Sequence, residues 1–216
     1  MTIRYTSIVI FRRLNMKHKR KRGIQIPQLI SIGVYTALYF VIVGLSAMLT
    51  VFLVPGYSFI FIPIVSALLA GTVFSLMVAK VPQFGAITIM ASIMGLFFFL
   101  SGRFPLALFP SIGFGLLADA IAYGFKYKSK KGLLLSYIVF SYGTIGPILP
   151  FFFLPEFYAQ DLVERGRDLT YIEGAFANIS GNTAVIIGVL IFIAALIGGL
   201  FGQRMMKKHF EKAGIV

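Results

Sequence analysis

The chain has 216 residues, is 58% hydrophobic and only 12% charged, and its mean hydropathy is +0.91. A typical soluble domain is about 25% charged, so this chain has too few polar groups to cover a globular surface in water. Its 20 Lys and Arg against 7 Asp and Glu give a net charge of +13. Basic chains often bind nucleic acid. Here, however, the basic residues flank long apolar runs, which indicates a multi-pass protein of the lipid bilayer with no nucleic-acid partner.

Several kinds of catalytic and metal site are excluded by composition. The chain has no Cys, and its two histidines, His18 and His209, lie in basic terminal segments. This leaves no thiolate, and no histidine for a metal site or for Ser-His catalysis inside the membrane. No G-x-x-x-x-G-K-[ST] motif is present, so the chain is not expected to hydrolyse ATP by itself. We therefore expect no enzyme activity, no catalytic residue, no bound metal and no cofactor.

Six segments are long and apolar enough to cross a bilayer, which takes about 20 residues of helix. They are predicted at Leu29–Val54, Ser58–Ala79, Phe84–Leu100, Pro105–Phe125, Leu133–Leu154 and Asn182–Gly202. Turns rich in Pro and Gly separate most of them, and the one long polar connection runs from Glu156 to Gly181. The sequence therefore predicts an all-α integral membrane fold with about six transmembrane helices in one compact bundle.

The basic residues predict how this bundle is oriented. They are concentrated before the first span and after the second, fourth and sixth, and only Arg103, Arg165 and Arg167 fall on the other side. By the positive-inside rule, both termini are expected to be cytoplasmic, in the cell membrane. We divide the chain into a basic N-terminal segment at 1–25, a six-helix transmembrane domain at 26–204 and a basic tail at 205–216. The start codon is either Met1 or Met16, which begins a second basic leader.

Asp119 is the one carboxylate within the predicted spans. A carboxylate inside a membrane is costly and therefore needs a partner. Two interpretations remain open: Asp119 lies close enough to Lys126 and the cytoplasmic face to be hydrated or paired, or it contacts a partner subunit.

Pairs of small residues four positions apart allow two membrane helices to approach closely. Most such pairs pack a bundle internally, although any one of them can also bind another protein. The pairs in this chain are Gly33/Ala37, Ala67/Gly71, Ala91/Gly95 and Ala194/Gly198/Gly202.

Aromatic and polar residues collect on the side opposite the basic one. They are predicted either to form an aromatic belt at the membrane interface or to line a ligand pocket under the loops. Pro147 and Pro150 break the outer end of the fifth span. Arg103 is the best single anchor, because a guanidinium suits a carboxylate or phosphate. The candidate ligand-binding residues are Tyr57, Phe59, Arg103, Phe104, Glu156, Tyr158, Asn178 and Asn182. The hydroxyls of Tyr142 and Thr144 are expected to bond to helix carbonyls instead.

The chain resembles a known family from about Gly23 onward. The resemblance rests on Ile26-Pro-Gln-Leu-Ile-Ser-Ile-Gly-Val-Tyr-Thr-Ala-Leu-Tyr-Phe-Val41, on Leu116-Leu-Ala-Asp-Ala-Ile121 and on the six-helix plan. These are similar to the MptD-like (Trep_Strep) branch of the substrate-specific S components of energy-coupling factor (ECF) transporters. The overall pattern carries the likeness more than any one motif does.

This resemblance implies a substrate-capturing subunit of an ATP-driven importer. Such a subunit binds a small organic micronutrient, such as a vitamin, a precursor or a tetrapyrrole, near its outer side. Its partners are a transmembrane coupling subunit and two cytosolic ATPase subunits. The first helix of S components carries an A-x-x-x-A pattern that contacts the coupling subunit. Here the pattern reads Gly33-x-x-x-Ala37, which keeps both residues small.

Two other functions are the alternatives. A stand-alone channel or facilitator would need a polar lining through its spans. A non-transporting membrane scaffold would bind protein partners without binding a small molecule.

Overall fold

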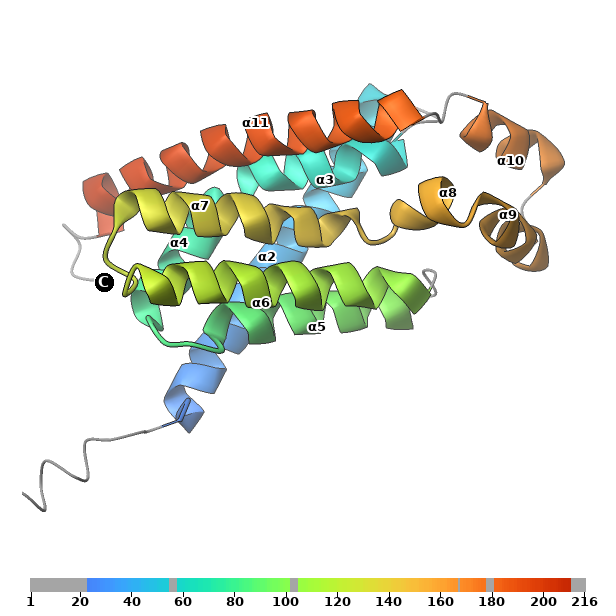
Figure 1. Cartoon of the computed structure of the whole chain (residues 1–216). Coiled ribbons are helices and arrows are strands. Elements are labelled where there is room, and N and C mark those ends of the chain that lie inside the picture. The colour runs from blue at the N-terminus through green and yellow to red at the C-terminus, as the bar shows by residue number, and fades with distance from the viewer. Residues whose placement is uncertain (1–22, 55–57, 102–104, 167, 178–180, 211–216) are drawn as a thin grey trace, which may run out of the picture.

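The computed structural model describes residues 23–54, 58–101, 105–166, 168–177 and 181–210, and every regular element in these ranges is a helix (Figure 1). The predicted all-α membrane bundle is therefore confirmed. The elements are α2 (Ile26–Leu53), α3 (Ser58–Leu69), α4 (Gly71–Lys80), α5 (Ala86–Leu100), η1 (Pro105–Ala107), α6 (Leu108–Gly124), α7 (Lys130–Ser141), η2 (Tyr142–Ile145), α8 (Leu149–Phe153), α9 (Pro155–Glu164), α10 (Leu169–Phe176), α11 (Gly181–Met205) and the π-helical turn η3 (Met206–Phe210).

The predicted spans differ in how continuous their helices are. By length and composition, α2 and α11 can each cross a membrane alone, and α3 with α4, bent by 51° between them, can together form a third span. Helices α5 and α6 are apolar but shorter, with 15 and 17 residues. The fifth predicted span is broken into α7, η2 and α8. This break follows from Gly143, Gly146 and Pro147, which disfavour a continuous helix.

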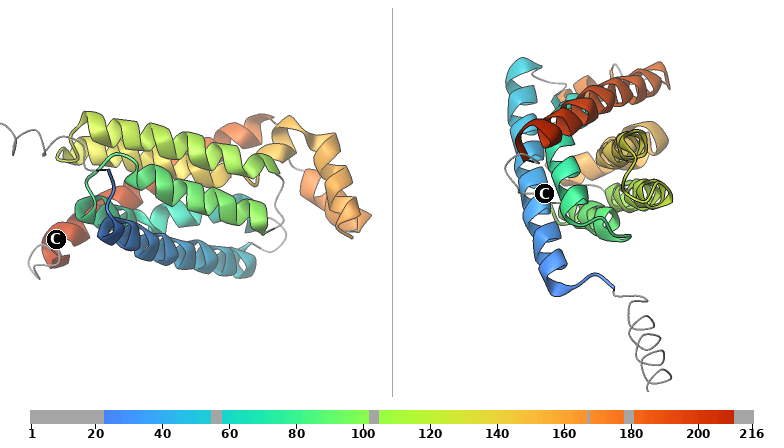
Figure 2. Two further views of the ribbon diagram at one scale, coloured as in Figure 1. Left: turned by 90° about the horizontal axis from the view of Figure 1, so that it is seen from below. Right: turned by 90° about the vertical axis from the view of Figure 1, so that its left-hand side faces the viewer.

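The spans form a closed ring. Going round it, α2 packs on α3 and α4, these pack on α11, and α11 packs on α7; α7 then packs on α6, α6 on α5, and α5 back on α2 (Figure 2). An aromatic cluster fills the centre. Phe74 lies 5.0 Å from Tyr137 and 5.1 Å from Phe140 between ring centroids, and Tyr39 lies 5.3 Å from Phe140. All four rings are buried.

Glycines allow the bent span to cross α11 in backbone contact. A Cβ on Gly71 would overlap the carbonyl of Gly198, and a Cβ on Gly202 would overlap the carbonyl of Gly71. The small-residue pairs on these two spans therefore pack inside the bundle. The same holds between α5 and α6, where a Cβ on Gly115 would overlap the side chain of Ala91.

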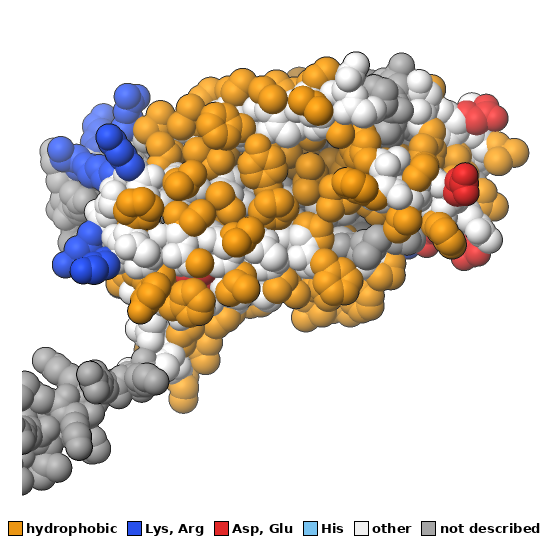
Figure 3. Space-filling view, in the orientation of Figure 1, with side chains coloured by type: hydrophobic (Ala, Val, Ile, Leu, Met, Phe, Trp, Pro, Cys, Tyr) orange, Lys and Arg blue, Asp and Glu red, His pale blue; other side chains and the backbone are white. Residues whose placement is uncertain are grey.

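Charged side chains gather at the two ends of the bundle, with a broad apolar belt between them (Figure 3). Most described Lys and Arg lie at the end that holds the α6–α7 turn and the last turn of α11, and most Asp and Glu lie on α9 and α10 at the opposite end, together with Arg165. We call these the basic end and the acidic end. The belt is built from exposed apolar side chains such as Leu45, Leu117 and Ile197, as expected of a surface that faces lipid.

The connection that the sequence predicted as polar is largely helical. Helices α9 and α10 occupy most of it, and they bury one apolar face at the acidic end. Tyr158, Leu162 and Ile172 of this face pack around Ile148 and Phe151. Burial of these side chains favours the two short helices, which in isolation are too short to be stable.

Candidate functional site

Phe151 is the centre of an aromatic cluster at the acidic end. Its ring stacks on Phe59 of α3 with a centroid distance of 4.8 Å and an interplanar angle of 16°. It also meets Tyr158 of α9 edge-on at 4.6 Å and Phe176 of α10 at 5.0 Å. Phe151 is only 5% exposed. It therefore joins the ring bundle to the segment α8–α10, which we call the cap segment.

A small cavity of about 50 Å³ lies beside this cluster. Its lining residues come from α3, the break after α7, and the cap segment: Phe59, Ile62, Pro63, Thr144, Pro147, Ile148, Phe151 and Tyr158. Since one water takes about 30 Å³ of liquid, the cavity has room for roughly one or two waters. Ligand pockets usually enclose about 300–1,000 Å³. The cavity is therefore much smaller than a typical ligand pocket.

Two prolines and a broken helix line this cavity. Pro63 lies inside α3 and has no N–H, so the carbonyl of Phe59 lacks its usual helical donor. On the other wall, the hydroxyl of Thr144 donates to the carbonyl of Ser141 at 2.8 Å. The Tyr142 hydroxyl likewise donates to the carbonyl of Gly188 at 2.7 Å. Both hydroxyls bond to helix carbonyls, as the sequence predicted.

The predicted ligand-binding residues are placed in three ways. Phe59 and Tyr158 line the cavity. Glu156, in the first turn of α9, and Asn182, at the start of α11, are exposed at the same end of the molecule and are not among the lining residues. The other four lie outside the described residues: Tyr57, Arg103, Phe104 and Asn178.

Sequence reasoning missed part of the lining. Ile62, Pro63 and Ile148 were not singled out, and Thr144 was expected only to bond to a carbonyl. One signal was available, because Pro63 interrupts an otherwise continuous apolar run and prolines inside membrane helices often mark irregular backbone.

The small pair on α2 faces away from the bundle. Gly33 and Ala37 are both exposed, and nothing lies within 4 Å of the position where a Gly33 Cβ would be. Gly44, two turns further along, is also exposed and has no neighbour within 4 Å of its Cβ position. Figure 2 shows α2 along one edge of the bundle. This pair therefore differs from the other three predicted pairs, which are used for internal packing.

Asp119 has an internal structural role. It is fully buried, and its Oδ2 accepts hydrogen bonds from the backbone N–H of Gly85 at 2.7 Å and from the N–H and hydroxyl of Thr88 at 3.1 and 2.9 Å. Gly85 is the N-cap of α5 and has no side chain with which to cap the helix. A carboxylate from α6 thus performs the capping and interacts favourably with the α5 dipole.

The second oxygen of Asp119 bonds to the α6–α7 turn. Its Oδ1 accepts from the hydroxyl of Tyr127 at 3.0 Å. Burial, together with the charge of Asp119 and this hydrogen bond, raises the pKa of Tyr127 above its ordinary value of 10.0. The predicted pairing with Lys126 is replaced by these bonds. Because the carboxylate has no exposed surface, the predicted contact between Asp119 and a partner subunit has no surface available to it.

The turn that carries Tyr127 is a Schellman motif. The N–H of Lys126 donates to the carbonyl of Tyr123 at 2.8 Å, and that of Tyr127 donates to the carbonyl of Ala122 at 2.9 Å. Lys126 and Tyr127 have φ values of 52° and 57°, in the left-handed region that favours glycine. The Asp119–Tyr127 bond helps to hold this turn in place.

Comparison with known proteins gives a family match. Residues 26–212 match the family described as "Hypothetical bacterial integral membrane protein (Trep_Strep)". No curated protein and no solved structure matches the chain.

Proposed function

The chain belongs to the Trep_Strep family of bacterial integral membrane proteins, and from this premise we propose that it is the substrate-capturing S component of an ECF-type importer. It would bind a small organic micronutrient at the acidic end and dock on a transmembrane coupling subunit through α2. Two cytosolic ATPase subunits would supply the energy. The chain itself would perform no chemistry.

One observation carries this proposal: the outward-facing small pair Gly33 and Ala37. Three of the four predicted small-residue pairs pack against other helices within the bundle. In contrast, no atom lies within 4 Å of the position that a Cβ on Gly33 would take. A smooth strip on a membrane helix favours close approach of a second helix, because van der Waals packing drives association in lipid. The occupant of this strip in the proposed complex is a helix of the coupling subunit.

The cavity at the acidic end supports the capture role. Its lining is aromatic and aliphatic with hydroxyl groups and no charged side chain, which favours the ring system of a nutrient over an ion. Outward movement of the cap segment would enlarge the cavity, and its return would cover the bound molecule.

The charge distribution supports an orientation. The basic end would face the cytoplasm and the acidic end the outside of the cell membrane. This orientation puts the ligand cavity on the side from which a nutrient arrives.

The packed interior counts against a stand-alone channel. Tyr39, Phe74, Tyr137 and Phe140 fill the centre of the ring. Buried hydroxyls of Thr36, Thr50 and Ser141 bond to carbonyls of their own helix turns. These three hydroxyls are therefore engaged within their own helices and do not favour a polar lining.

The test is co-purification of the tagged chain with the coupling and ATPase subunits of its host. The double variant Gly33→Leu/Ala37→Leu should lose the complex, because bulky side chains would obstruct the strip. Gly113→Leu/Ala120→Leu is the matched control on α6. Gly113 and Ala120 are exposed, nothing lies within 4 Å of the Gly113 Cβ position, and the substitutions are the same.

The outcomes separate the proposal from its alternatives. Loss of the complex in the α2 variant alone, together with a small-molecule adduct in native mass spectra of the purified chain, supports the S component. Complex formation without any adduct in protein from the native host favours a scaffold. Retention of the complex by the α2 variant would overturn the docking role of Gly33 and Ala37.

A further inference from the structure

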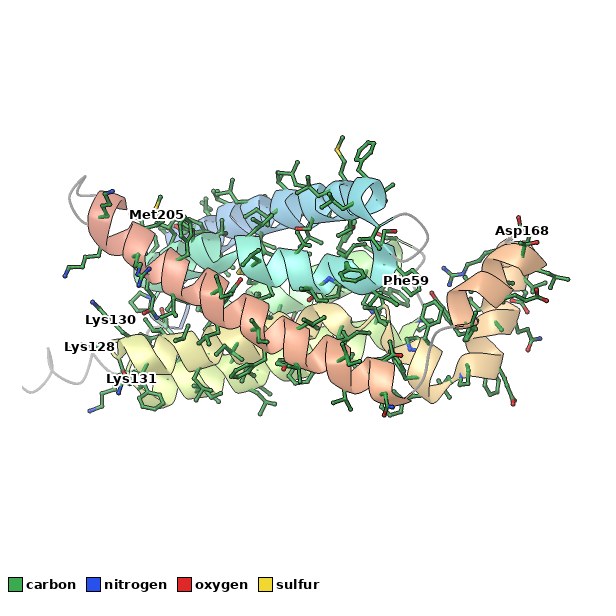
Figure 4. All side chains as sticks on the ribbon, turned by 90° about the horizontal axis from the view of Figure 1, so that it is seen from above. Phe59, Lys128, Lys130, Lys131, Asp168 and Met205 are labelled. Atoms are coloured by element: carbon green, nitrogen blue, oxygen red, sulfur yellow. The ribbon has the colours of Figure 1, made fainter. Side chains whose placement is uncertain are left out.

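The basic end carries a second and larger hollow, of about 540 Å³. It lies between the first turn of α7 and the last turns of α11. Its lining residues are Lys130, Leu200, Gln203, Arg204, Lys207 and Lys208. Figure 4 shows Lys130 and Met205 at the same end of the molecule, Lys130 with Lys128 and Lys131, and Met205 at the end of α11. Four of the six lining residues are cations, and all four are exposed.

A hydrogen bond between two elements holds the hollow in shape. The side-chain amide of Gln203 donates to the backbone carbonyl of Lys130 at 2.7 Å, which ties α11 to the start of α7. Within the described ranges, the ion pair joins Arg165 and Asp161, and it lies at the acidic end. Among the described residues, therefore, no carboxylate neutralises the four cations of the hollow.

The basic end borders the apolar belt directly (Figure 3). Leu200 forms its apolar wall, and exposed Ile197 and Phe201 continue this surface on α11. A cationic rim beside an apolar surface matches a molecule with an anionic head and an aliphatic tail. Basic hollows between membrane helices are known to bind the head groups of anionic lipids.

We propose that this hollow binds an anionic phospholipid of the membrane leaflet at the basic end. The guanidinium of Arg204 can hold a phosphate by two parallel hydrogen bonds, and the three lysines add attraction as point charges. The acyl chains lie along Leu200 and the exposed face of α11. The apolar wall favours a lipid over free inorganic phosphate as the occupant.

Lipid titration of the delipidated full chain in zwitterionic detergent, read by native mass spectrometry, tests the proposal. Phosphatidylglycerol and phosphatidylcholine with identical acyl chains are the probes. Phosphatidylglycerol should bind at least about tenfold more tightly, since each cation near the head group adds attraction. The variant Arg204→Gln/Lys207→Gln/Lys208→Gln should lose this preference. Its matched control, Lys126→Gln/Lys128→Gln/Lys131→Gln, removes the same charge from the same end without altering the lining, and should retain it.

Three results would overturn the proposal. An equal loss of the preference for phosphatidylglycerol in both triple variants would show that the basic surface attracts any anion diffusely. Equal binding of the two lipids to the unaltered chain would show that the cations do not select the head group. Displacement of phosphatidylglycerol by equimolar inorganic phosphate would show a free phosphate site. All substituted side chains are exposed, and an unchanged melting temperature in the same detergent confirms that each variant is folded.

Discussion

Phe59 of α3 and Phe151 of α8 stack almost in parallel, with 4.8 Å between ring centroids. The pair joins an element of the ring bundle to the cap segment, and both rings line the small cavity. Contacts from Tyr158 and Phe176 also converge on Phe151. Phe151 therefore links the three helices of the cap segment to one another and, through Phe59, to the ring bundle.

Replacing Phe151 by Ala should release the cap segment while leaving the ring bundle folded. Replacing a buried Phe by Ala lowers the free energy of unfolding by about 3–5 kcal/mol. Here we expect the destabilisation to be confined to α8–α10. We expect faster amide hydrogen exchange at 149–176 and little change in α2 or α6. Phe153→Ala is the control, because Phe153 on the same helix is 74% exposed. Similar exchange in the two variants would contradict the central role of Phe151.

Replacing Asp119 by Ala should lower the melting temperature in detergent substantially. The change leaves the N–H groups of Gly85 and Thr88 without their acceptor, and a hydrogen bond to a charged group contributes about 1.5–3 kcal/mol. Asp119→Asn should also destabilise, since the neutral amide loses the negative charge that favours these hydrogen bonds and the α5 N-terminus. Tyr127→Phe removes a single bond and should cost less, about 0.5–1.5 kcal/mol. If Tyr127→Phe were as damaging as Asp119→Ala, capping of α5 would not be the main role of the carboxylate.

Adding one methyl group at Gly198 should destabilise the bundle. A Cβ there would overlap the carbonyls of Ala67 and Leu68, which cannot move without shifting α3. Forcing extra volume into a packed interior costs about 1–3 kcal/mol or more. The same change at Gly33 meets no neighbour and replaces a poor helix former, so Gly33→Ala should be neutral or slightly stabilising. Thermal unfolding of the two variants side by side is the measurement.

Alkaline pH should weaken the α6–α7 turn through Tyr127. Its pKa is raised in the folded chain by burial and by Asp119, so the folded state holds this proton more tightly than the unfolded state does. The resulting contribution to stability is fully present below about pH 10 and declines as the pH rises further. The melting temperature of Tyr127→Phe should therefore fall less steeply than that of the unaltered chain above about pH 10. If the melting temperatures of the two proteins fell in parallel with rising pH, Tyr127 would have the same pKa in the folded and unfolded states.

The membrane helices could be predicted because the signal is local. A run of about 20 apolar residues between turns indicates both the length of a helix and its apolar surroundings. The described parts of all six such segments are mainly helical, although the second is bent and the fifth is broken. The cap segment was missed for the opposite reason. The apolar face of α9 and α10 is short, and its packing partner Phe151 lies on another element, so composition alone favoured a polar loop.

The roles of the small residues and of Asp119 depend on contacts across the fold. Gly33/Ala37 and Ala67/Gly71 have the same spacing in the sequence, and only the packing of α2 shows that the first pair faces outward. Asp119 lies 34 positions from Gly85, and no local pattern connects a carboxylate to the uncapped start of another helix. The sequence correctly indicated that Asp119 needs a partner, but not which groups supply it.

The capping of α5 by a residue of α6 makes the two helices interdependent. Without Asp119, the backbone N–H groups of Gly85 and Thr88 at the start of α5 have no acceptor. Without α5, the buried carboxylate of Asp119 on α6 loses these hydrogen-bond donors. Neither helix can unwind at this end alone at low cost. The two helices therefore form a single cooperative unit of local unfolding, whose amides should exchange together.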